Sequence, residues 1–185
     1  VDGDDYHDFL NQFGPFLDIK KPSFIDNMKF MFVFQFGKMY WRYFMWNFTG
    51  RQNDVQWQGG NLNGNWISGI DFIDSMHLGL SQDNLPSDVK NNKARNTYYF
   101  LPFILGLIGF FFMFNKDKKL FWVLLVFFLF TGLAIQVYTN VRPFEPRERD
   151  YSVVGSFYVF ALWIGIGVYA IFDLLKTYAS KRILA

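Results

Sequence analysis

The sequence contains no cysteine among its 185 residues. Disulfide bonds, thiolate metal sites and a cysteine nucleophile are therefore excluded, although this absence says little about the compartment. The sequence also lacks a P-loop, a dinucleotide fingerprint, a zinc motif and the residue order of a Ser-His-Asp triad. We therefore expect no cofactor, and no active site that is complete within this chain.

The chain also lacks a large excess of charge of either sign, because its formal net charge is only +2. There is no long basic run and no basic face with interleaved stacking residues, so we exclude nucleic acid as a partner. The chain begins at Val1 without a signal-peptide pattern and stops at Ala185 soon after an apolar segment. We expect it to be an internal fragment of a longer protein.

Aromatic residues are abundant, at 22% of the chain, and apolar residues concentrate in its second half. Three uncharged runs cover residues 98–114, 120–139 and 153–172. Each is long enough for the roughly 17 to 25 helical residues that cross a bilayer, and backbone groups in lipid must be satisfied within a helix. We predict an all-α integral membrane protein in which residues 98–185 form an antiparallel set of three transmembrane helices.

Residues 24–49 predict an amphipathic aromatic helix, with Ser23 as its N-cap and Gly50 as its C-terminal stop. On a helical projection the polar side chains fall on one stripe: Asn27, Gln35, Lys38 and Arg42. Burying Lys38 and Arg42 in a bilayer costs about 3 kcal/mol each, whereas a helix at the interface leaves both in water. We therefore predict an interfacial helix in preference to a spanning one.

The remaining polar segments are expected to lie outside the membrane. Residues 1–23 predict a polar loop, and residues 50–97 predict an irregular region, rich in Gly and Asn, with one short helix over 67–80. Turn chemistry alone explains a surface loop here. It does not explain Arg51 and Asp54 so close to the helix end, so we select these two, together with Asn53, as candidate substrate-binding residues.

Two partial metal patterns occur in these polar segments. One is the acidic cluster of residues 2–8, which lacks the glycine that a calcium loop needs at its sixth position. The other is the i, i+3 series Asp71, Asp74 and His77, which lacks a further well-placed ligand. A solvated polar face explains both, and we expect no metal site.

The connection between the last two predicted spans holds a dense charge cluster. Pro143 and Pro146 prevent either helix from continuing. In an extended chain the side chains alternate, so Arg147 and Arg149 face one way while Glu148 and Asp150 face the other. Paired guanidinium groups bind phosphate, and the acids would hold a sugar hydroxyl or an acceptor. The alternative is that these charges neutralise one another at the rim of the helices.

Several motifs together resemble a bacterial multi-pass membrane family, once listed as a domain of unknown function. They are residues 39–48 (MYWRYFMWNF), 50–54 (GRQND), 65–69 (NWISG), 146–151 (PRERDY) and 155–158 (GSFY). That family is now grouped with transmembrane protein O-mannosyltransferases of the type that modifies plexin-like domains. The resemblance covers nearly the whole chain after residue 24.

The resemblance implies a GT-C type glycosyltransferase of the inner membrane, with a polyprenyl-phosphate-linked sugar as donor and an acceptor protein. It places residues 1–97 and 140–152 on the periplasmic side, a question that the evenly distributed Lys and Arg residues leave open. The catalytic base of such enzymes is an acidic residue of the first outer loop. No position here matches it, so the base is expected outside this chain. The alternative function is a membrane scaffold or export component that docks a partner through the aromatic helix and outer loops.

Overall fold

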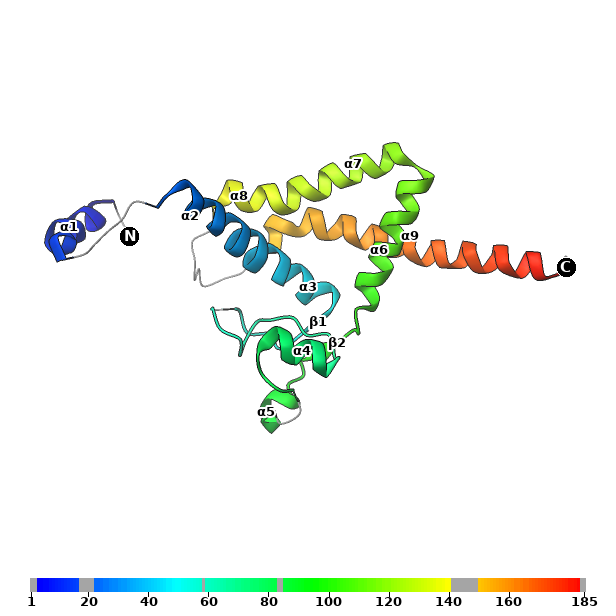
Figure 1. The fold of residues 1–185 in the computed structure, drawn as a ribbon, viewed down its shortest axis with the longest axis horizontal. Helices are drawn as coiled ribbons and strands as arrows, with labels where there is room; N and C mark the ends of the chain where they lie inside the picture. The colour runs from blue at the N-terminus through cyan, green and yellow to red at the C-terminus, as the bar shows by residue number, and fades with distance from the viewer. Residues whose placement is uncertain (1–2, 17–21, 58, 83–84, 141–149, 184–185) are drawn as a thin grey trace.

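The structure is a computed structural model that describes residues 3–16, 22–57, 59–82, 85–140 and 150–183. The chain is mostly helical, as predicted, with one small two-stranded sheet. Figure 1 shows an upper group of long helices and, below it, the irregular region of residues 50–97. The helix of residues 24–48 lies between the two.

The N-terminal segment is helical where we expected a loop. α1 (Gly3–Phe13) is followed by the short 3-10 turn η1 (Gly14–Phe16). The rings of Phe9 and Phe13 lie on one side of α1 with their centroids 5.1 Å apart, and Pro15 follows the helix. The prediction for residues 1–23 overlooked this i, i+4 aromatic pair, which favours a helix. α1 stands apart from the other helices (Figure 1).

α2 (Phe24–Lys29), η2 (Phe30–Trp41) and α3 (Arg42–Phe48) form one continuous helix, called helix 24–48 below. Its predicted start is confirmed by a capping box, in which the Asp26 amide donates to Ser23 Oγ at 3.3 Å and the Ser23 amide donates to Asp26 Oδ2 at 2.9 Å. Gly50, with φ +148°, follows the end of the helix as predicted. The η2 segment has π-helical bonding, a variation that often marks a functional segment.

The polar stripe of helix 24–48 does not face water throughout. Lys38 is exposed, but Arg42 is only 4% exposed. The Arg42 guanidinium donates to the carbonyl of Gly64, and its Nε donates to the Lys38 carbonyl at 3.0 Å. The expectation that both cations remain in water is therefore wrong for Arg42, because residues of the irregular region cover it.

The irregular region is closed by β1 (Gly50–Arg51) and β2 (Asn96–Thr97), which pair antiparallel with Gly50 opposite Thr97. Between them lie α4 (Asp71–Leu78) and α5 (Ser87–Lys90). α4 is the short helix predicted over 67–80. It is shorter than predicted because residue 70 is still extended and Gly79, at φ +66°, ends it in the left-handed conformation.

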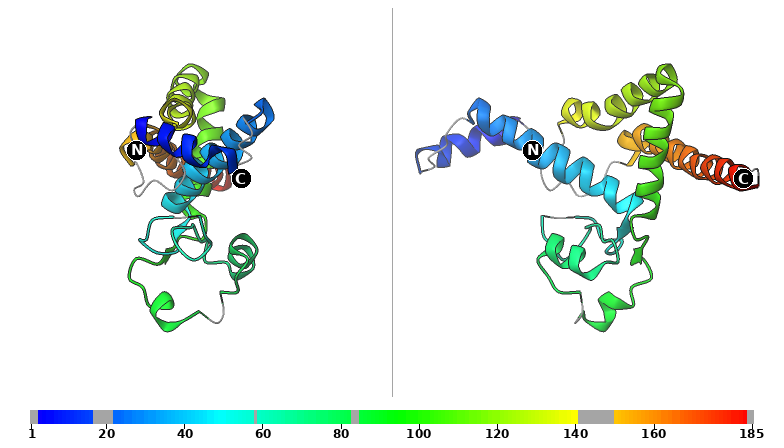
Figure 2. Two further views of the ribbon diagram at one scale, coloured as in Figure 1. Left: turned by 90° about the vertical axis from the view of Figure 1, so that its left-hand side faces the viewer. Right: turned by 45° about the vertical axis from the view of Figure 1, so that its right-hand side comes forward.

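The long helices are α6 (Leu101–Lys116), a continuous segment made of α7 (Lys118–Leu129), η3 (Phe130–Ala134) and α8 (Ile135–Thr139), and α9 (Asp150–Ile183). Within the described residues, two segments are long and apolar enough to cross a membrane: Lys118–Thr139 and Tyr151–Tyr178. A third span is not confirmed, because α6 has only 16 residues. α7 and α9 run antiparallel as predicted, whereas α6 crosses them steeply (Figures 1 and 2).

Glycines permit the close crossing of α6 and α9. A Cβ atom on Gly109 would overlap the carbonyl of Trp163 and lie 2.7 Å from the amide nitrogen of Gly167. A Cβ on Gly167 would overlap the carbonyl of Leu105. The two backbones are therefore in direct contact, a kind of crossing that small residues at a helix interface allow.

We predict that Gly109→Ala destabilises the helices while Gly165→Ala does not. The methyl group that alanine introduces at position 109 must push α6 away from α9, and overpacking of this kind costs about 1 to 3 kcal/mol. A Cβ on Gly165 meets nothing within 4 Å, so this matched change is expected to be neutral or stabilising by up to about 1 kcal/mol. Unfolding curves of both variants in detergent micelles measure the difference. Equal stability of the two variants would contradict the close crossing.

Candidate functional site

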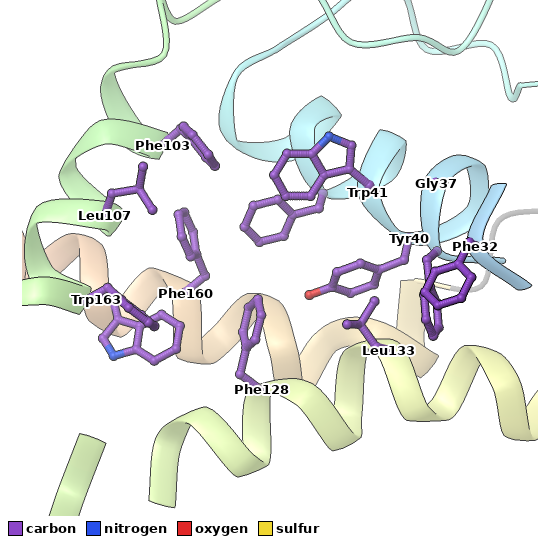
Figure 3. Close-up of a pocket in the computed structure, with 13 residues that line it drawn as sticks. Phe32, Gly37, Tyr40, Trp41, Phe103, Leu107, Phe128, Leu133, Phe160 and Trp163 are labelled. Atoms are coloured by element: carbon purple, nitrogen blue, oxygen red, sulfur yellow. The ribbon is translucent and has the colours of Figure 1, made fainter. Parts of the chain in front are cut away.

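An apolar cavity of about 450 Å³ lies between helix 24–48 and the long helices. Figure 3 shows its walls, which are built from side chains of four segments. Helix 24–48, through η2 and α3, forms one side, and α6, the α7–η3 segment and α9 form the others. The lining residues are Phe32, Phe36, Gly37, Tyr40, Trp41, Phe44, Phe103, Leu107, Phe110, Phe128, Leu133, Phe160 and Trp163.

The walls are held by ring contacts between elements distant in the sequence. The Phe44 ring meets Phe160 edge-on with centroids 4.6 Å apart, and Trp41 meets Phe103 edge-on at 6.1 Å. Edge-to-face pairs of this kind stabilise a core beyond their buried area. Among the described residues, no charged side chain lines the cavity. The cavity is therefore suited to a hydrocarbon chain, since an unpaired polar ligand would lose its hydrogen bonds there.

A polar contact at the cavity wall joins three helices. The Tyr40 hydroxyl hydrogen-bonds Ser156 Oγ, and both residues are buried. A Cβ on Gly132 would lie 2.8 Å from each of these two oxygens. A side chain at this position of η3 would therefore crowd the hydrogen bond, and glycine leaves room for it. This satisfied pair fixes helix 24–48 against η3 and α9.

A second polar contact lies near the N-terminal half of helix 24–48. Gln35 Nε2 donates to Asn140 Oδ1 at 2.9 Å, and Asn140 ends α8 in the left-handed conformation. The predicted phosphate-binding residues Arg147 and Arg149, and Glu148 beside them, lie outside the described residues. Asp150 is the first residue of α9.

The Gly-Arg-Gln-Asn-Asp segment is built into the fold of the irregular region. Asn53 is only 7% exposed. Its Nδ2 donates to Asn63 Oδ1 at 2.8 Å, its Oδ1 accepts from the Gly64 amide at 2.9 Å, and its carbonyl accepts from Trp46 Nε1 at 3.3 Å. Asn53 therefore holds the turn that supplies the Gly64 carbonyl to Arg42.

The other two candidates of this segment have different surroundings. The Arg51 guanidinium lies 4.0 Å from the centroid of the Trp46 ring, a cation–π contact. Its Nε is buried without a hydrogen-bond partner in the described part of the chain. Asp54 is exposed. The structure therefore does not join these three residues through a shared hydrogen bond within its described ranges.

The possible metal series on α4 is occupied by other contacts. Asp74 is buried, and its carboxylate accepts from the Ser68 amide at 2.6 Å, the Ser68 hydroxyl at 2.8 Å and the Gly69 amide at 2.8 Å. The imidazole of His77 stacks on Trp66 with centroids 4.0 Å apart. Within the described ranges no group of three His, Asp or Glu side chains is arranged to hold a metal ion.

Two basic side chains near Asp74, His77 and Arg95, have lowered pKa values. Burial lowers the pKa of His77; Lys38 acts in the same direction and Asp74 opposes it. Burial also lowers the pKa of Arg95, again opposed by Asp74. Arg95 donates to Gln82 Oε1 at 3.0 Å. Neither His77 nor Arg95 is among the described residues that line the cavity.

No protein family, curated protein or solved structure matches the chain. The site therefore has to be interpreted from its own chemistry. Sequence reasoning missed the cavity, although the series Phe32, Phe36, Tyr40 and Phe44 at i, i+4 spacing was visible. We assigned that face of the helix to the lipid interface instead of to the other helices.

We predict that Asn53→Ala destabilises the irregular region while Asp54→Ala has little effect. Removing the Asn53 amide leaves the Gly64 amide without its acceptor, at a cost of about 1 to 3 kcal/mol. Replacing exposed Asp54 should change stability by about 0.5 kcal/mol or less. Hydrogen exchange at residues 50–65 measures both. Unchanged protection in Asn53→Ala would show that the amide network does not hold this turn.

Proposed function

We propose that this chain is part of a membrane glycosyltransferase that transfers a sugar from a polyprenyl-phosphate donor to protein hydroxyls on the periplasmic face. The aromatic cavity is the observation that carries the proposal. Its volume of about 450 Å³ and uncharged lining suit several units of an isoprenoid chain, which has no hydrogen-bonding groups. The two segments able to cross a membrane agree with such a lipid substrate, and the sequence motifs described above resemble an enzyme family of this kind.

The headgroup of the donor would be bound by the charged connection after Asn140. Phe32 and Phe36 line the cavity, and Gln35 between them is hydrogen-bonded to Asn140. The cavity wall is therefore tied to the residue from which that connection starts. We assign the donor phosphate to Arg147 and Arg149, and a sugar hydroxyl or the acceptor to Glu148 and Asp150. The structure leaves a role in substrate contact open for Arg51 and Asp54, whereas Asn53 is engaged in the fold.

With these assignments, the chain is the part of the enzyme that binds the donor. It holds the lipid in a dry pocket and orients the phosphate, which is where much of the catalytic advantage of positioning arises. The base that deprotonates the acceptor hydroxyl would come from outside this chain, because no position of the sequence matches the acidic residue of the first outer loop that the resemblance implies.

A second function is favoured by one observation on α4. Phe72 and Met76 lie one turn apart and are 76% and 71% exposed. A scaffold or export component would use such side chains to dock a partner protein. Tyr40 and Phe44 of helix 24–48 are buried against the other helices, whereas Phe32 and Trp41 are 57% and 47% exposed. Docking would therefore use the exposed rings of this helix together with the irregular region. The donor-binding variants below separate the two functions, because a scaffold does not require the cavity.

We predict that Arg147→Ala and Arg149→Ala each lower sugar transfer by about 10- to 100-fold. Hydrogen bonds to a charged group contribute about 1.5 to 3 kcal/mol, which corresponds to this range of rate. The measurement is glycan transfer by the full-length protein in membranes. Lys90→Ala, on exposed α5, is the matched loss of a cation and should leave transfer unchanged. Normal transfer by both arginine variants would rule out a phosphate role for this pair.

We predict that Leu133→Trp weakens use of the donor by filling the cavity, of which Leu133 forms a wall. Leu129→Trp places the same ring one turn earlier at an exposed position and serves as the control. The expected result is a raised KM for the polyprenyl donor in Leu133→Trp only, with similar thermal stability of the two variants. Equal KM values would show that the donor chain lies elsewhere.

A further inference from the structure

A compact group of lysines stands at the turn between α6 and α7. Lys116 is the last residue of α6, and Lys118 and Lys119 open α7. All three are exposed, with Asp117 as the one acid among them. This turn belongs to neither the cavity nor the irregular region, and the proposed sugar transfer makes no use of it.

Asp117 is already engaged as the N-cap of α7. Its Oδ1 accepts from the Leu120 amide at 3.0 Å. Within the described ranges no carboxylate forms a salt bridge with the three lysines. Within the described residues the turn therefore carries positive charge that no salt bridge neutralises, and this charge is complementary to an anion.

Aromatic rings accompany the charges. The ammonium group of Lys116 lies 5.5 Å from the centroid of Phe112, and that of Lys118 lies 5.9 Å from Phe114. Trp122, one turn into α7, is 55% exposed, and Phe111 is 59% exposed. Lysine stems that follow apolar surface and end in a charge are typical of residues at a membrane interface, as are exposed tryptophans.

We propose that the α6–α7 turn binds the phosphate groups of anionic phospholipids. The segment Lys118–Thr139, which is apolar enough to cross a membrane, begins at this turn, so its lysines lie at headgroup depth when the segment is inserted. The phosphates meet the ammonium groups, and the upper acyl chains meet Phe111 and Trp122. A soluble anionic partner would satisfy the lysines but leave those rings in water, which is why we assign a lipid surface.

The test is lipid selectivity of the chain reconstituted in nanodiscs. Spin-labelled phosphatidylglycerol and spin-labelled phosphatidylcholine are compared by the fraction of each that the protein immobilises. We expect a preference for phosphatidylglycerol that falls by up to about fivefold for each lysine replaced and falls with added salt. The variant is Lys116→Gln, Lys118→Gln and Lys119→Gln combined. The control is Lys90→Gln with Lys93→Gln, which removes exposed lysines from the irregular region.

Loss of the preference in the triple variant but not in the control, at equal thermal stability of both proteins, supports the assignment. Retained preference in the triple variant, or equal immobilisation of the two lipids by the unmodified chain, overturns it. Neither result depends on sugar transfer, so failure here leaves the proposed function untouched.

Discussion

The rest of the structure depends on helix 24–48, which buries an aromatic face and a polar face at the same time. One face carries large aromatic rings, which pack against α6, α7 and α9. The other carries Arg42, whose guanidinium is buried and donates to the Gly64 carbonyl. A buried cation without a hydrogen-bond partner would be costly. The irregular region that covers Arg42 also supplies its partner, the Gly64 carbonyl. The two parts of the chain are thereby attached to one helix.

The cavity follows from the same packing. Rings contributed by four segments meet edge to face, and the cavity lies between them. Two satisfied polar contacts, Tyr40 with Ser156 and Gln35 with Asn140, fix the position of helix 24–48. With the wall held in place, the space between the rings is preformed, so its side chains would need little further ordering when a ligand enters.

Local signals in the sequence predicted much of this fold. Ser23 and Gly50 set the ends of helix 24–48 correctly, and uncharged length identified the two segments able to cross a membrane. The failures concern tertiary contacts. Periodicity placed Arg42 on a polar stripe but could not show that Gly64 would cover it. Composition marked α6 as a span but not its steep crossing of α9. The cavity was missed because an aromatic face suits lipid and protein equally well.

Docking of helix 24–48 against the other helices is the central claim, and the absence of cysteine allows a direct test by cross-linking of introduced thiols. The pair is Gln35→Cys with Asn140→Cys, at positions whose native side chains are 2.9 Å apart. The control pair is Gln35→Cys with Tyr138→Cys, because Tyr138 is 85% exposed. With a short thiol-specific cross-linker in membranes, we expect efficient closure of the first pair and little of the second. Failure of the first pair to cross-link, with both thiols reactive, would contradict the account.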